Sequence, residues 1–128
     1  MPEIGVIFYK EDEGSVPVLD WIVGLNPKAQ SKCVARINRL QVRGHQLRRP
    51  EADYLRNGIY ELRVAHQWIN YRILYFFHSS TAAVLAHGIV KKRRVAPREI
   101  DRAILRKRKF DQNPKWHTYH IEVEEDGK

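Results

Sequence analysis

Apolar and polar residues alternate most regularly in the middle of the chain. Residues 58–77, GIYELRVAHQWINYRILYFF, read as two strands with Arg63 and Arg72 placed among the apolar positions. Alternation with a period of two is typical of strands that bury one face only, so this stretch is predicted to form a β-hairpin. β-Branched and aromatic residues predict two further strands, at 3–9 and at about 82–90.

Other segments show the three- and four-residue spacing of amphipathic helices. In one of them Cys33, Val34, Ile37 and Leu40 recur at helical spacing after Asn26-Pro27, a predicted N-cap followed by a proline at the first helical position. Gly44 is predicted to end this helix, and the polar segment after it to be a loop at 45–56. The helices are expected at about 16–25, 27–43 and 97–110.

The predicted order of elements is β-α-α-β-β-β-α. Consecutive strands joined by short turns favour an antiparallel sheet, and we expect the helices to pack on one face of it, which is an α+β fold. The chain has no internal repeats or linkers. We therefore predict a single domain at 1–110, followed by an acidic C-terminal tail extension at 111–128.

The hairpin has a predicted register. A turn centred on His66-Gln67 places Glu61 opposite Arg72 and Arg63 opposite Asn70 on one polar face. The other face is apolar, and its six residues are Tyr60, Leu62, Val64, Ile69, Tyr71 and Ile73.

The strand at 82–90 extends the polar face. Pairing Phe77 with Ala82 across the HSST turn places His87 opposite Arg72, and Lys91 has the same parity. Four potential cations are therefore predicted to meet beside one carboxylate; the group is Arg63, Arg72, His87, Lys91 and Glu61.

Such a group suits a phosphate better than a metal ion. Attack of an RNA 2′-OH on the neighbouring phosphate requires removal of a proton, stabilisation of a doubly charged transition state and protonation of the leaving 5′-oxygen. Arginine offers several donors to phosphate oxygens, and histidine transfers protons near neutral pH. We expect neither a metal nor another cofactor. The alternative is structural: Glu61 and Arg72 as a plain cross-strand ion pair, and His87 as a hydrogen-bonded strand residue.

Charge and composition add a second indication. The net charge is +8, and residues 91–110 contain ten basic side chains against two acidic ones. Such a basic block is typical of a phosphate-binding surface, although it also fits a solvated helix face. The single cysteine, the absence of an apolar run long enough to cross a bilayer and the acidic N-terminal stretch favour a cytoplasmic protein. The pair of histidines in HTYH lacks a third metal ligand at a recognisable spacing.

Four motifs occur in a familiar order: GIYELR, YRILYFF, VLAHGIVKK and PREIDRAILR. Together they resemble the HigB-like, phage-related branch of the RelE/ParE superfamily of bacterial toxins, over roughly residues 3–110. The resemblance implies a RelE-like fold and the toxin of a type II toxin–antitoxin system, a ribosome-dependent mRNA endonuclease (mRNA interferase). It also implies a cognate helix-turn-helix antitoxin, with the ribosome and mRNA as further partners and no membrane.

The resemblance assigns roles to individual residues. Arg72 matches the position that contacts the scissile phosphate, and Arg63 matches a basic position on the preceding strand. Lys91 and Lys92 match the basic residues that follow the last core strand. His87 lies nearby and is a candidate proton carrier. RelE has a tyrosine near the start of its final helix and PREIDRA has none, so the acid–base pair stays open. RNA contacts are expected from the basic block; the candidates are Lys92, Arg93, Arg94, Arg106, Lys107, Arg108 and Lys109.

Two other functions remain open on the sequence. One is a ParE-like toxin that inhibits DNA gyrase by binding to it and cleaves nothing. The other is a non-catalytic, basic nucleic-acid-binding module, such as a prophage remnant. The four cations on one sheet face favour the endonuclease, because a binding protein has no evident need for all of them.

Overall fold

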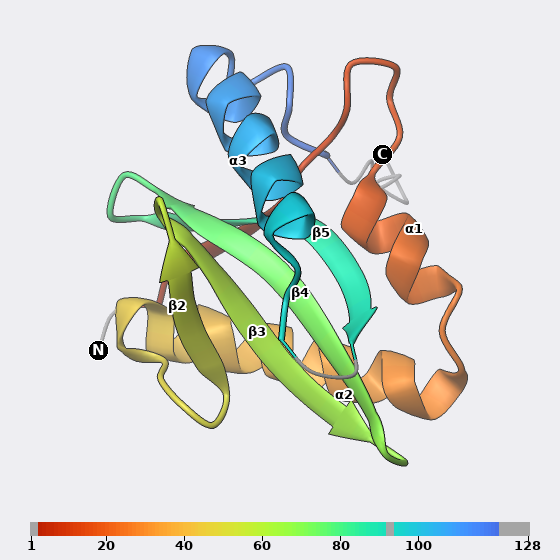
Figure 1. Ribbon diagram of the computed structural model, residues 1–128. Helices are drawn as coiled ribbons and strands as arrows, with labels where there is room; N and C mark the ends of the chain where they lie inside the picture. Colours follow the sequence, from red (N-terminus) through yellow and green to blue (C-terminus); the bar gives the residue numbers. More distant parts are fainter. Residues whose placement is uncertain (1–2, 92–93, 121–128) are drawn as a thin grey trace, which may run out of the picture.

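The computed structural model of the chain describes residues 3–91 and 94–120. Its elements follow the predicted order with one additional strand, and Figure 1 shows their arrangement. They are β1 (Gly5–Phe8), α1 (Pro17–Val23), α2 (Pro27–Arg43), a short 3-10 turn η1 (Gly44–Gln46), β2 (Ala52–Arg56), β3 (Ile59–His66), β4 (Ile69–His78), β5 (Ala82–Lys91) and α3 (Pro97–Gln112).

The sheet has five strands in the order β1-β5-β4-β3-β2, and it is mixed. The α+β class is confirmed, but the prediction of an antiparallel sheet is wrong for β1, which pairs with β5 in parallel. These two strands are distant in the sequence, so the rule that short turns make antiparallel neighbours does not apply to them. The prediction of a loop at 45–56 is also wrong, because β2 forms the sheet edge against β3.

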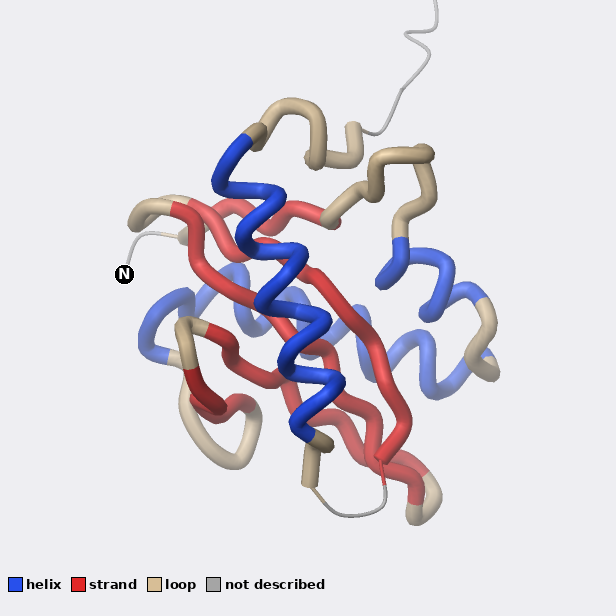
Figure 2. Tube along the Cα trace, turned by 45° about the horizontal axis from the view of Figure 1, so that its top comes forward, coloured by secondary structure: helices blue, strands red, loops and turns tan. Residues whose placement is uncertain are grey.

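Helices cover both faces of the sheet, and the prediction of one covered face is therefore wrong. Ile73 and Tyr75 pack in a core with α1 and α2, whereas Leu74 and Phe76 pack in a second core under α3. Neighbouring residues of a strand point to opposite faces, so β4 is buried from both sides. Figure 2 shows α3 lying across one face, with the other two helices behind the strands.

Local signals explain where the helices begin and how they sit. The Asn26 side chain accepts a hydrogen bond from the Ala29 amide at 2.9 Å, and α2 ends at Gly44 with φ 55°, as predicted. The Trp21 ring of α1 lies directly on Gly88 of β5, where an added Cβ would come within 2.3 Å of it. Glycine at this position therefore allows α1 to pack closely on the sheet.

The hairpin register differs from the predicted one by two residues. Gln67 and Trp68 form the turn, so that Arg63 lies opposite Arg72 and Glu61 opposite Leu74. A slip of two residues conserves the parity of the strand, and the predicted division into faces is retained.

The pairing of β4 with β5 also differs from the prediction. Phe77 pairs with Ala83 rather than Ala82, and an irregularity between Leu74 and Tyr75 then shifts the register. After that shift His87 lies opposite Leu74, on the same sheet face as Arg72.

The segment after α3 reaches the edge of β1 at Thr118 and Tyr119. Thr118 forms an antiparallel bridge with Tyr9, and the Tyr119 amide donates to the Phe8 carbonyl at 3.0 Å. The buried His117 ring stacks on the Tyr9 ring with 5.2 Å between centroids. This segment thus covers the edge of β1 that β5 leaves open.

Candidate functional site

A cleft of about 480 Å³ opens on the α3 side of the sheet, where β2, β3 and β4 meet the start of α3. Its lining is rich in arginine: five guanidinium groups face two carboxylates. These charged residues are Arg49, Arg56, Arg63, Arg72, Arg94, Asp53 and Glu61. A cleft with this charge balance attracts anions.

The centre of the cleft holds two arginines opposite each other with one carboxylate between them. Arg63 and Arg72 are directly paired residues of β3 and β4. Glu61 forms an ion pair with each, at 3.2 Å to Nη1 of Arg63 and 3.3 Å to Nε of Arg72. Like charges directly opposite in a sheet are destabilising. Because one carboxylate serves two guanidinium groups, the centre retains a net positive charge.

Arg72 is the most buried cation of the cleft. Its side chain is only 7% exposed, and Nη1 donates to the backbone carbonyl of Tyr71 at 3.1 Å. Burial lowers the pKa of Arg72 below its usual value, an effect that Glu61 opposes and Arg63 reinforces. A guanidinium still carries its charge at neutral pH, and in a poorly hydrated place that charge binds an anion more strongly than it would in water.

The outer arginines of the cleft are partly compensated. Arg49 pairs with Asp53 at 2.7 Å, and Arg56 pairs with Asp101 of α3 at 2.8 Å. The Asp53 pKa is lowered by its hydrogen bond to Arg49, so this carboxylate is charged at neutral pH. Arg94 is exposed at the rim. The excess of positive charge therefore lies at the Arg63–Arg72 centre and at Arg94.

His87 lies on the predicted face but does not line the cleft. Its Nε2 is 2.6 Å from Glu99 of α3, and its Nδ1 is 3.3 Å from Nη1 of Arg106. Arginine only donates, so Nδ1 is the acceptor and Nε2–H donates to Glu99. Burial lowers the His87 pKa, and Arg106 adds to this effect against the opposing Glu99. His87 is thus a neutral ring that connects β5 to α3.

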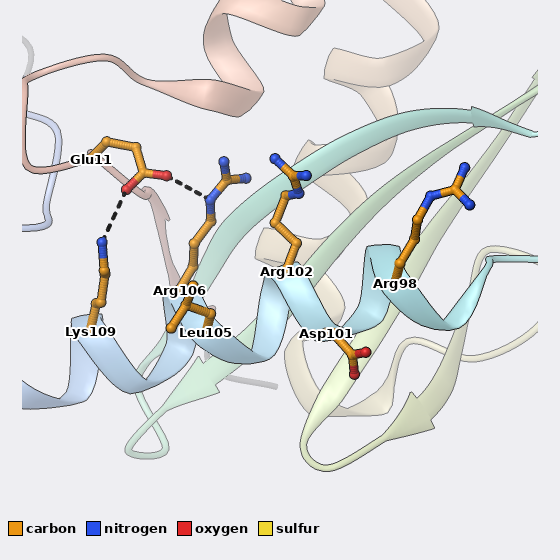
Figure 3. Close-up of a pocket in the computed structure, with 7 residues that line it drawn as sticks. All are labelled: Glu11, Arg98, Asp101, Arg102, Leu105, Arg106 and Lys109. Atoms are coloured by element: carbon orange, nitrogen blue, oxygen red, sulfur yellow. Dashed lines mark hydrogen bonds and ion pairs between the residues drawn. The ribbon is translucent and has the colours of Figure 1, made fainter.

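The basic block of α3 is largely occupied by ion pairs. A second cavity of about 350 Å³ lies between α3 and Glu11. Glu11 lies between Arg106 and Lys109 (Figure 3), at 2.9 and 4.0 Å from them, and Lys109 also contacts Asp12 at 3.1 Å. Lys107 pairs with Asp111 within the helix at 3.0 Å.

The remaining predicted residues are spread over the surface. Arg108 is exposed on α3, and Lys91 at the end of β5 pairs in register with Asn70 outside the cleft. Lys92 and Arg93 lie outside the described residues. Of the four predicted catalytic residues, the structure brings together Arg63 and Arg72 and separates His87 and Lys91 from them.

Sequence reasoning missed part of the cleft. Arg49, Asp53 and Arg56 belong to the stretch that was predicted to be a loop, so they were not considered as site residues. The signal that was available is the short run ADYLR, a strand-like segment just before the Asn57-Gly58 turn.

Within residues 3–91 and 94–120, no three side chains of the metal-ligating types lie close enough together to hold an ion. In the same residues, no helix combines the length and apolarity that crossing a bilayer would require.

Residues 20–108, well over half of the chain, match the family model described as Phage derived protein Gp49-like (DUF891). No curated protein of known identity matches the chain. The matched segment runs from α1 to the last turns of α3, so it contains all the charged residues of the cleft.

Proposed function

We propose that this chain, which belongs to the Phage derived protein Gp49-like family, a RelE-like, toxin-like family, is the toxin of a type II toxin–antitoxin system and cleaves mRNA on the ribosome. The observation that carries the proposal is the Arg63–Glu61–Arg72 arrangement inside a cationic cleft. The family supports toxicity, and the cleft supports a phosphate as the group on which the protein acts. The HigB-like assignment is part of the same proposal.

In this mechanism the two central arginines bind the scissile phosphate. As the 2′-oxygen attacks phosphorus, a 2′,3′-cyclic phosphate forms and negative charge builds up on the non-bridging oxygens. The bond to the 5′-oxygen breaks, and this oxygen takes up a proton from water to leave as a 5′-OH. Arg63 and Arg72 donate hydrogen bonds to those oxygens and stabilise the transition state more than the ground state. Glu61, held between them, is placed to accept the proton of the 2′-OH.

The proposal gives His87 a positioning role only. Its ring nitrogens are taken by Glu99 and Arg106, and it does not line the cleft. The ribosome is the proposed site of action, and the proposed partner of the toxin is a helix-turn-helix antitoxin. A protein with a net charge of +8 associates rapidly with an acidic partner, which then competes with RNA for the cationic surface.

A gyrase-inhibiting toxin is the second candidate, and the position of His87 favours it. Without a histidine in the cleft, the described lining offers two carboxylates, Glu61 and Asp53, and lacks an evident acid for the leaving 5′-oxygen. A protein that only binds would need no such acid.

Induced expression in a bacterial host, followed by mapping of mRNA 5′ ends, tests the proposal. The endonuclease predicts new 5′ ends within translated messages soon after induction, and their loss when translation initiation is blocked. A supercoiling assay with purified gyrase is run in parallel. Growth arrest with inhibited supercoiling and without new 5′ ends would replace the endonuclease with the gyrase inhibitor.

A further inference from the structure

The turn between β3 and β4 has an unusual backbone for its sequence. Gln67 and Trp68 have φ values of 51° and 70°, so both turn residues are in the left-handed region. Two-residue turns of this kind favour Asn-Gly, because a side chain larger than that of asparagine is strained there. A bulky tryptophan is therefore energetically unfavourable at this position.

Packing within the chain does not compensate for that strain. The Trp68 side chain is 101% exposed, so both faces of the indole ring are open to solvent, and the neighbouring Ile69 is 40% exposed. Figure 1 shows the hairpin tip projecting beyond the body of the sheet. A strained residue without internal contacts points to a contact with something outside the protein.

A cationic groove lies at the end of β3 from which the tip projects. It has a volume of about 280 Å³ and lies between α2 and the end of β3, where the pairing of β2 has ended at Ala52 with Leu62. Its charged lining is three cations of α2 and one carboxylate, namely Lys32, Arg36, Arg39 and Glu51.

The carboxylate compensates only part of this charge. Arg39 forms two hydrogen bonds with Glu51, at 2.7 and 3.0 Å, whereas the nearest approach of Arg36 to it is 4.0 Å. Lys32 is exposed. The groove thus presents two cations that Glu51 compensates weakly, Lys32 and Arg36, and the exposed tip follows the end of β3 that lines it.

We propose that the hairpin tip and this groove bind single-stranded RNA: an unpaired base stacks on Trp68, and the adjoining phosphates contact Lys32 and Arg36. Stacking on an aromatic ring together with a cationic track is how proteins hold single strands. A protruding ring with two open faces suits a base, and the positive groove suits the backbone that carries it. This inference rests on the proposed function, because it assigns part of the same RNA to a second surface.

The groove and the cleft lie on opposite faces of the sheet, because the groove is lined by α2 whereas the cleft opens on the α3 side. The RNA segment held at the hairpin tip and the groove is therefore a different part of the strand from the phosphate in the cleft.

Direct binding tests the proposal without the ribosome. The affinity of the full chain for a short, non-cleavable single-stranded RNA with 2′-O-methyl groups is compared with its affinity for the same backbone with abasic sites. Because base stacking is worth a factor of about ten or more, Trp68→Ala is expected to weaken binding of the first oligomer at least about ten-fold. The same substitution is expected to leave binding of the abasic oligomer unchanged.

Two further variants separate stacking from charge. Trp116→Ala removes a half-exposed tryptophan at the other end of the molecule and is expected to leave both affinities unchanged. The double variant Lys32→Gln with Arg36→Gln is expected to weaken the binding of both oligomers to the same extent and to reduce the salt dependence of binding. Circular dichroism checks that each variant is folded.

The outcomes distinguish this inference from the proposed function. If the wild-type chain binds RNA and the Trp68→Ala variant binds it with the same affinity, the stacking role is overturned and the cleft proposal is left intact. Equal affinity of the wild-type chain for both oligomers would also overturn it, and would point to a protein as the partner of Trp68. If the wild-type chain cleaves no mRNA in cells while Trp68→Ala still weakens RNA binding, only the endonuclease proposal is contradicted.

Discussion

Replacing Glu61 with glutamine is expected to destabilise the protein, and phosphate is expected to restore part of the loss. Glutamine preserves the size of the side chain and removes the charge that lies 3.2 and 3.3 Å from two opposed arginines. At an effective dielectric constant of about 20, one charge pair at such a distance is worth about 5 kcal/mol before desolvation. Arg63 is about a third exposed, so its contribution is reduced by solvent.

The expected net loss is about 2–3 kcal/mol of unfolding free energy, because two guanidinium groups then face each other without a counter-charge. For a domain of this size that loss lowers Tm by about 10 °C. Phosphate at about ten times its Kd stabilises the folded variant by about 1.4 kcal/mol through mass action. Glu61 no longer competes for the arginines, so this gain is larger in the variant than in the wild-type chain.

The assay is thermal unfolding of both proteins in phosphate and in sodium chloride of equal ionic strength, which separates binding from screening. Asp111→Asn is the control, since Asp111 pairs with Lys107 on the surface of α3 and lines neither the cleft nor the groove. It is expected to lose less than about 1 kcal/mol and to gain nothing specific from phosphate. If Glu61→Gln responds to phosphate no more than to chloride, the cleft is not a phosphate site.

Three other perturbations follow from the structure. Gly88→Ala is expected to cost about 2–3 kcal/mol in chemical denaturation, since the added methyl meets the Trp21 ring; an unchanged midpoint would contradict the close packing of α1. Gln67→Asn with Trp68→Gly is expected to stabilise the chain by about 1 kcal/mol by relieving the turn, and a loss of stability would show that Trp68 packs on the protein. Burial holds the His87 pKa below 6.5 in the folded state, so the unfolded chain takes up a proton first and stability falls as the pH drops below 6.5. The lowered pKa of Glu99 extends this loss below pH 4.5. The His87→Gln variant should show a flatter profile of stability against pH below 6.5, and an unaltered profile would assign the effect to other groups.

The division of the hairpin into two faces was predictable because it depends only on parity. The turn position was misjudged by one residue, which moved the register by two and left Arg63 and Arg72 on the predicted face. The partner of Arg72 was not predictable in the same way. The sequence AHQW contains no residue that marks a left-handed turn, so nothing local indicated that Gln67 and Trp68 would adopt it.

Features that depend on distant contacts were missed. The sequence predicted that α3 packs on the sheet, but it did not indicate on which face. That choice depends on Leu74 and Phe76, which lie beyond the polar end of the hairpin and form a core under α3. The neighbours of His87 follow from the same choice, because Glu99 and Arg106 reach it only when α3 crosses that face. The short edge strand β2 was overlooked because its residues are mostly polar.

The central claim is that Arg63 and Arg72 bind the phosphate that is cleaved, and mapping mRNA 5′ ends after induction of an Arg63→Gln variant tests it most directly. Arg63 is suited to this test because Glu61 retains Arg72 as its partner, so the variant is expected to fold. The account predicts that the wild-type chain produces new 5′ ends within translated messages, that Arg63→Gln reduces them at least about a hundred-fold, and that His87→Gln retains them. New ends at the wild-type level from a folded Arg63→Gln variant, or their loss in His87→Gln alone, would contradict it.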